Sequence, residues 1–146
     1  MPQILPDSIY NNYAIIDNDK EVLQTGAFLS RSNAFALYQK LGALTDQRIC
    51  VVYEGGYYKV RVYGFDNRTI AGQFVARFAA LGFQLFYYPT VKSNKSIQVG
   101  EYENEKDALI SRDAWSKRQV KPVIILYDNG FYRVQVQGIT SDQKSE

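Results

Sequence analysis

The sequence predicts an α+β fold in which antiparallel strands are combined with helices. Two observations support this prediction. A glycine-containing turn at residues 54–56 joins two short strands, and residues 57–63 alternate between side chains of two kinds. The pattern then recurs 74 positions later, where residues 128–136 repeat residues 54–62. The chain is therefore expected to contain two related units.

Residues 1–19 are expected to be an N-terminal extension with one strand, which the β-prone run at residues 9–16 predicts. The first complete unit is expected at residues 20–89. A polar segment at residues 90–95 has the composition of a linker, and it leads to a second unit at residues 96–146.

The first unit begins with a predicted strand at residues 21–28, and a helix follows it. Ser30 or Ser32 is expected to cap this helix, since a serine hydroxyl accepts well from the free N–H groups of a first turn. The apolar side chains recur at helical spacing: Ala34, Phe35, Leu37, Tyr38 and Leu41.

A hairpin and a second helix complete the first unit. The strands of the hairpin are predicted at residues 49–53 and 57–63, and a last strand at residues 83–88. Asp66 is expected to cap the second helix, and Gly82 to end it in a left-handed conformation. The predicted apolar stripe comprises Ile70, Phe74, Phe78 and Leu81.

The second unit repeats the beginning of the first but not its end. Strands are predicted at residues 98–102, 123–127 and 131–137, and a helix at residues 105–118. A second helix and a fourth strand are missing, which leaves a sheet edge and an apolar face uncovered. Three completions are open: the N-terminal strand folds across, the two units share one core, or another chain supplies the missing part. That other chain is an envelope protein or a second copy.

The composition is globular, and it excludes several classes of function. Of 146 residues, 46% are hydrophobic, and 12 Tyr and 8 Phe are an unusual share of rings. A net charge of +2 is too small to indicate a nucleic acid partner. Because the chain has no histidine, it lacks the commonest general base and metal ligand. We therefore expect no catalytic residues, no metal and no cofactor.

The single cysteine and the apolar runs say little about location. Cys50 lies in an apolar strand and is expected to be a buried hydrophobe. No apolar run reaches the length that spans a membrane, and the first residues are no signal peptide. The chain is then either cytosolic or a piece of an exported protein.

The strand at residues 57–63 is expected to have one buried and one open face. Tyr58, Val60 and Val62 point to one side of the sheet, whereas Tyr57, Lys59, Arg61 and Tyr63 point to the other. The second copy places Phe131, Arg133, Gln135 and Gln137 on the corresponding side. A face that alternates rings and cations, and does so twice, indicates a binding surface.

Several short motifs occur in order in the first unit, and the first strand and the hairpin recur in the second. They are a Gln-x-Gly-x-aromatic strand at residues 24–28, an Asn-Ala pair at residues 33–34, the hairpin at residues 56–62 and Ala-Leu-Gly at residues 80–82. In this combination the chain resembles the SPOR domain, the sporulation-related repeat of bacterial envelope proteins. The resemblance covers residues 20–89 fully and residues 96–139 in part. It implies a ferredoxin-like βαββαβ fold with helices on one face of an antiparallel sheet.

The resemblance also implies a function, namely non-catalytic binding of peptidoglycan glycan strands without stem peptides. The implied location is the periplasm or cell envelope. By position, the contacting glutamine matches Gln24 and Gln98, the aromatic residue matches Tyr57 and Phe131, and the basic residue matches Lys59 and Arg133.

Sugar chemistry is consistent with such a site. Flat rings cover the CH faces of sugars, and an amide serves their hydroxyls as donor and acceptor. Lys59, Arg61 or Arg133 is expected to pair with the free lactyl carboxylate. The chain departs from the family pattern at two places in each unit. Ala27 and its counterpart Glu101 replace a small hydroxyl residue, and Tyr63-Gly64 and Gln137-Gly138 replace the usual Gly-Pro after the third strand.

Three other functions compete with this one. A structural or assembly module in an envelope complex is the main alternative, because an uncovered strand edge invites pairing with a partner. RNA binding by the sheet face is disfavoured by the low net charge and by the lack of the aromatic-rich consensus of RNA-recognition motifs. An enzyme is disfavoured because Glu54 and Asp128 are most simply polar turn residues.

Overall fold

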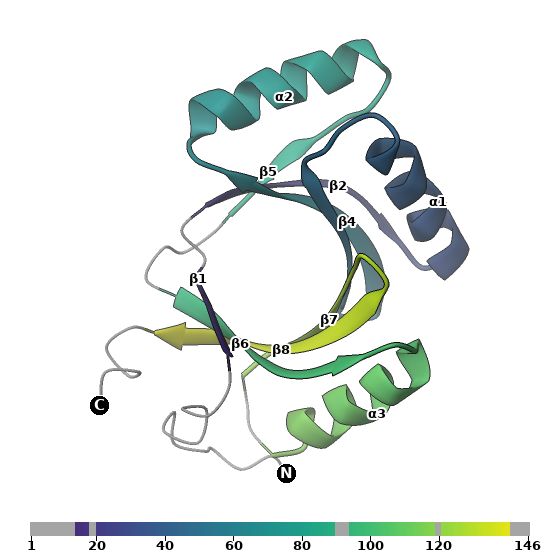
Figure 1. Ribbon diagram of the computed structural model, residues 1–146, viewed down its shortest axis with the longest axis vertical. Helices are drawn as coiled ribbons and strands as arrows, with labels where there is room; N and C mark the ends of the chain where they lie inside the picture. Colours follow the sequence, from purple (N-terminus) through teal and green to yellow (C-terminus); the bar gives the residue numbers. More distant parts are fainter. Residues whose placement is uncertain (1–13, 18–19, 90–93, 119–120, 141–146) are drawn as a thin grey trace. The chain divides into compact units, whose positions relative to one another are not determined.

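The structure is a computed structural model that describes residues 14–17, 20–89, 94–118 and 121–140 (Figure 1). The chain divides into two compact units, Asp19–Thr90 on the one hand and Met1–Asn18 with Val91–Glu146 on the other. Both units combine antiparallel strands with helices, and the predicted α+β class is therefore confirmed.

The first unit is an antiparallel sheet covered by two helices on one side (Figure 1). Its strands follow the order β3-β4-β2-β5, which places the first and third strands in the centre, as in a ferredoxin-like sheet. The strands are β2 (Glu21–Phe28), β3 (Arg48–Glu54), β4 (Tyr57–Phe65) and β5 (Phe86–Tyr88), and the helices are α1 (Arg31–Gly42) and α2 (Arg68–Ala80). The strand predicted at residues 21–28 is confirmed residue for residue.

The helix caps confirm one prediction and correct another. Ser30 caps α1, because its hydroxyl accepts from the N–H of Asn33 at 3.2 Å. The prediction that Asp66 caps α2 is wrong. Asn67 does so and accepts from the N–H of Ile70 at 2.9 Å, whereas Asp66 forms an ion pair with Lys20. The hydrogen bond from Lys20 lowers the pKa of Asp66.

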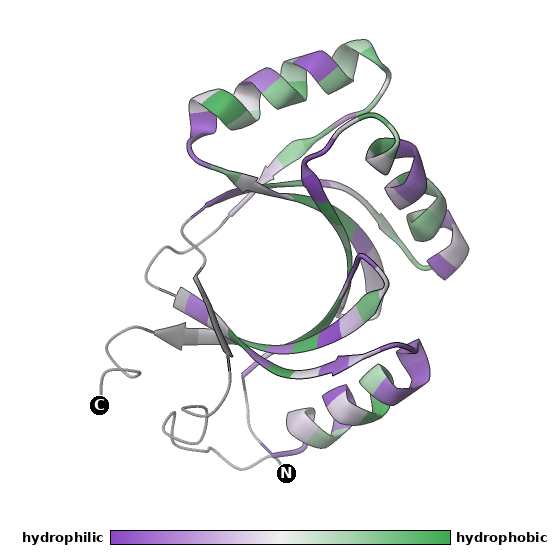
Figure 2. Cartoon of the chain, viewed as in Figure 1, coloured by the Kyte–Doolittle hydropathy of each residue, from purple (hydrophilic) through white to green (hydrophobic). Residues whose placement is uncertain are grey.

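The apolar side of α2 lies slightly off the predicted stripe. Phe74 and Phe78 are buried as expected, and their rings stack at 4.2 Å, but Ala71 takes the third buried position. The remaining two stripe residues, Ile70 and Leu81, are exposed. Figure 2 shows the resulting mixture of hydrophilic and hydrophobic residues along both helices of this unit.

The end of the first unit is shorter in strand than predicted. Gly82 has a φ of 93°, which confirms the left-handed end of α2, and the N–H of Phe83 bonds back to Phe78. The strand β5 begins only at Phe86, although Leu85 before it is buried.

The second unit obtains its missing strand from the N-terminus. The strand β1 (Ala14–Asp17) pairs antiparallel with β6 (Asn94–Tyr102), and residues 9–13 of the predicted strand lie outside the described residues. Of the three completions, the structure thus shows the first. The sheet order is β1-β6-β8-β7, with β7 (Val123–Asp128) and β8 (Phe131–Thr140). The strand β1 therefore has the place in this unit that β5 has in the first.

One helix, α3 (Glu105–Ser116), covers the second sheet within the described residues. Its Trp115 stands 74 positions after Leu41 of α1 and packs against the buried core residues Ile97 and Val136. No counterpart of α2 occurs in the described part of this unit. A large indole ring at this position supplies apolar contact area that a leucine would not.

Candidate functional site

Strand register brings the predicted site residues of the first unit onto one face of the sheet. Gln24 lies opposite Arg61, and Ala27 lies opposite Lys59 in the β2–β4 pairing. On the other side of β4, Tyr57 lies opposite Glu54. Directly opposed residues point to the same face of an antiparallel sheet. This face is the one turned away from α1 and α2.

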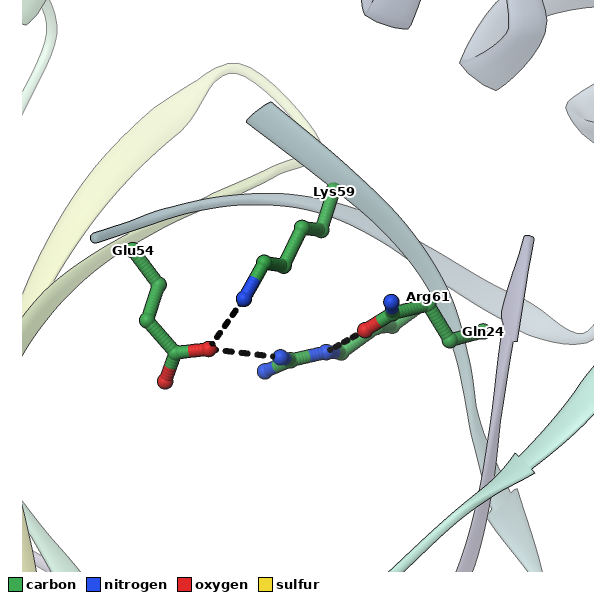
Figure 3. Close-up of polar contacts among 4 residues, drawn as sticks. All are labelled: Gln24, Glu54, Lys59 and Arg61. Atoms are coloured by element: carbon green, nitrogen blue, oxygen red, sulfur yellow. Dashed lines mark hydrogen bonds and ion pairs between the residues drawn. The ribbon is translucent and has the colours of Figure 1, made fainter. Parts of the chain in front are cut away.

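A network of charged groups connects the predicted residues on this face (Figure 3). The Glu54 carboxylate oxygen Oε1 accepts from Lys59 Nζ at 2.9 Å and from Arg61 Nη2 at 2.9 Å. Arg61 Nε donates to Gln24 Oε1, also at 2.9 Å. The guanidinium carbon of Arg61 lies 3.8 Å from the ring centre of Tyr88. Arg61 therefore contacts three residues, one on each of three other strands of the sheet.

The network keeps both of its central groups ionised. Burial raises the pKa of Glu54, but hydrogen bonds and positive charge from Lys59 and Arg61 outweigh it, and the net pKa is lowered. Burial lowers the pKa of Arg61. Tyr63, Tyr88 and Glu54 act in the opposite direction and outweigh the burial, so the net pKa of Arg61 is raised above its ordinary value. Removing one partner of such a buried ion pair is expected to destabilise the fold, because the other charge is then left uncompensated.

The prediction of an open face holds for some of these residues and is wrong for Arg61. Tyr57 is 44% exposed, and the Lys59 side chain is 22% exposed. The Arg61 side chain is only 2% exposed, and it contacts Gln24, Glu54 and Tyr88. A guanidinium enclosed in this way leaves little surface for a ligand to contact directly.

The second unit repeats the register with different chemistry. Gln98 lies opposite Gln135, which replaces the arginine by a buried neutral amide. Arg133 lies opposite Glu101 and donates to its Oε1 at 3.0 Å, and it lies 3.5 Å from Asp128 Oδ2. The carboxylate of Glu101 is thus neutralised by the cation that the sequence proposes for ligand binding. Phe131 stands beside Arg133, which lies 5.9 Å from its ring centre, and it is 36% exposed.

Sequence reasoning missed two residues of the first network. Its place at the hairpin tip indicates only a polar turn residue at Glu54. Yet Glu54 stands two residues after Val52, which puts it on the same strand face and within diagonal reach of Lys59. The alternation along β3 was therefore enough to predict that Glu54 lies near Lys59. Tyr88 carried no comparable signal, because its contact with Arg61 depends on the pairing of β5 with β2.

No group of three or more metal-ligating side chains occurs among the described residues. Within the same residues, no helix is both long and apolar enough to cross a membrane. A family model, described as the SPOR domain, matches residues 22–89. The chain contains a SPOR domain.

The match runs from β2 to the end of β5 and takes in every residue of the Arg61 network. SPOR domains are in general peptidoglycan-binding modules rather than catalysts, and proteins with a SPOR domain act in the bacterial cell envelope or periplasm. No curated protein and no solved structure matches the chain. The second unit follows the SPOR domain in sequence and repeats its strand register.

Proposed function

We propose that this protein binds the glycan strands of peptidoglycan, in the form stripped of stem peptides, through the SPOR-domain face that carries Gln24, Tyr57 and Lys59. The binding is non-catalytic, and it places the protein in the periplasm or cell envelope. The observation that carries the proposal is the shared register of these residues on the face opposite the helices.

Each residue has a distinct role in the proposal. The exposed ring of Tyr57 covers the CH face of a sugar, and the Gln24 amide serves sugar hydroxyls. Lys59 pairs with the lactyl carboxylate that stem-peptide removal leaves free. Because Glu54 already accepts from Lys59, the ligand carboxylate competes with an internal one, and this contact contributes about 1 kcal/mol or less.

In this proposal Arg61 does not contact the ligand but positions the Gln24 side chain. Its guanidinium fixes the Gln24 amide oxygen and thereby aims the remaining amide nitrogen at the ligand. The second unit is proposed as a weaker second site made of Gln98, Phe131 and Arg133. The assembly alternative loses its main support, since β1 now pairs with the edge of β6 that invited a partner.

Sedimentation with purified sacculi tests the proposal. The full chain is expected to pellet with amidase-treated sacculi, less with untreated ones, and less again at high salt. Tyr57→Ala is expected to weaken binding about tenfold, since one aromatic contact is worth about 1.4 kcal/mol. Tyr57→Ala combined with Gln24→Ala is expected to abolish pelleting.

Leu81→Ala is the matched control, because Leu81 is 54% exposed at the end of α2, on the helix-covered side of the sheet. Circular dichroism of each variant checks that the fold is retained. Pelleting of the double variant at the level of the unmodified chain would remove the site assignment. Equal pelleting with treated and untreated sacculi would remove the stated preference for stripped strands.

A further inference from the structure

Phe86 is the most exposed ring of the SPOR domain, at 60%, and neither the sequence motifs nor the network accounts for it. An isolated exposed apolar side chain needs no functional explanation. Phe86 differs in its place, since it pairs directly with Gln24 across the β2–β5 ladder. It therefore stands on the same sheet face as Gln24, Arg61 and Lys59.

The neighbours of Phe86 along β5 confirm which way its side chain points. Tyr88, two residues on and so on the same face, packs its ring against Arg61. Tyr87 between them points to the helix side, where its hydroxyl lies 3.4 Å from the carbonyl oxygen of Arg68. The strand thus supplies one ring that supports the network and one that is free of it.

We propose that Phe86 is a second sugar-stacking platform, which extends the site from the Tyr57 hairpin across Gln24 to the β5 edge. This inference rests on the proposed function. Strand spacing and rise put the Tyr57 and Phe86 positions about 16 Å apart on the sheet. The two rings then hold different sugars of one glycan strand, with Gln24 and Lys59 between them. The ligand is a chain of several sugars and not a disaccharide.

The second unit lacks this platform. The residue that pairs with Gln98 in the position of Phe86 is Ala14, which has no ring. The proposal therefore also ranks the two units: the SPOR domain holds long strands better than the second unit does, for a reason independent of the charge differences at Glu101.

Titration of the full chain with amidase-treated glycan fragments, fractionated by length, tests the proposal by calorimetry. The unmodified chain is expected to bind long fragments more tightly than short ones. Phe86→Ala is expected to lose about tenfold in affinity for long fragments and to leave short fragments unaffected, and Phe86→Trp to retain the length dependence. Tyr87→Ala is the matched control, because it removes the adjacent ring of the same strand from the opposite face.

The outcomes separate this inference from the proposed function. If the unmodified chain binds and Phe86→Ala binds every length equally well, the platform is refuted while glycan binding stands. An equal loss for short and long fragments places Phe86 at the centre of the site and also refutes the extension. If the unmodified chain binds no fragment, both the proposed function and the platform fall.

Discussion

Arg61 donates from Nη2 to the carboxylate of Glu54 at 2.9 Å, and its side chain is 2% exposed. A guanidinium in this state needs its counter-ion, since a buried charge whose partner is removed costs about 3–5 kcal/mol. The pair lies at the centre of the proposed binding face. Its integrity therefore affects both the stability of the SPOR domain and the orientation of Gln24.

The pairing of Glu54 predicts an acid-sensitive contribution to stability. The pKa of Glu54 is lowered from 4.5 in the folded chain. Its contribution is therefore complete above pH 4.5 and is lost as the pH falls through the lower folded-state value. Glutamine keeps an acceptor oxygen for Arg61 and loses only the charge, so Glu54→Gln is expected to cost less than removal of the whole partner, about 1–3 kcal/mol at pH 7. The difference from the unmodified chain should shrink below pH 4.5.

Urea unfolding from pH 7 to pH 3 measures this difference. Glu103→Gln, at an exposed position, serves as the control and should show little change across the range. A gap between Glu54→Gln and the unmodified chain that stays constant down to pH 3 would show that the carboxylate charge does not stabilise the fold.

Gly26 of the Gln-x-Gly motif is predicted to be required by its backbone and not by the ligand. Its φ is 78°, and it lies at the register shift between Thr25 and Ala27. A Cβ there would lie 2.5 Å from a ring carbon of Phe28. Gly26→Ala is therefore expected to destabilise the chain by more than 1 kcal/mol, about the cost of the backbone strain alone.

Variants of two other glycines distinguish the cost of the backbone conformation from the cost of the steric clash with Phe28. Gly82 also has a positive φ, of 93°, but a Cβ there meets nothing within 4 Å, so Gly82→Ala should cost less. Gly42, in α1, has neither problem, and Gly42→Ala should be neutral or stabilising. Thermal unfolding of the three variants checks the order, and a neutral Gly26→Ala would contradict it.

The pairing of β1 with β6 predicts that proline in β1 loosens the second unit and leaves the SPOR domain intact. Ile15 lies opposite Ile97 and Ile16 opposite Ser96. Adjacent residues of an edge strand direct their N–H groups alternately toward the partner and away from it. One of Ile15→Pro and Ile16→Pro therefore removes a ladder bond, at a cost of about 1 kcal/mol or more.

Amide hydrogen exchange reads the two units separately. Protection is expected to fall at residues 96–98 in the more damaging proline variant and to stay constant in β2 and β4. Unchanged protection of β6 in both variants would mean that the N-terminal strand contributes nothing to its stability.

The helix caps give a fourth prediction. Asn67→Ala removes the acceptor for the N–H of Ile70 and is expected to cost about 1 kcal/mol. Asp66→Ala should have little effect, since its ion pair with Lys20 is exposed. Chemical denaturation of both variants compares them, and a larger loss for Asp66→Ala would restore the cap assignment made from the sequence.

Local patterns predicted most of the fold. The predicted bounds of β2 match the structure to the residue. Alternation along β4 placed Lys59 and Arg61 on the same face of the sheet, because period-two geometry depends on adjacent residues alone. The sequence could not decide whether Asp66 or Asn67 caps α2, since both side chains are good caps. The extended backbone at Asn67 determines which of them does so.

Long-range contacts account for what the sequence did not predict. That β1 pairs with β6 depends on residues far apart in the chain, about which local propensity is silent. Likewise, the face on which Arg61 lies could be predicted, but its burial could not. Its contacts come from Glu54 of β3, Gln24 of β2 and Tyr88 of β5, which meet only after the sheet has formed.

The pairing of β1 with β6 also predicts an order of folding. The strands β1 and β6 are separated by about 75 residues, but Val22 and Tyr88 are paired neighbours within the SPOR domain. Once that domain has folded, the loop that must close shrinks to about ten residues, which lowers its entropic cost by about 2 kcal/mol. Folding of the SPOR domain thus brings β1 and β6 close together in the chain. The pairing of these two strands is expected to be fast only after the SPOR domain has folded.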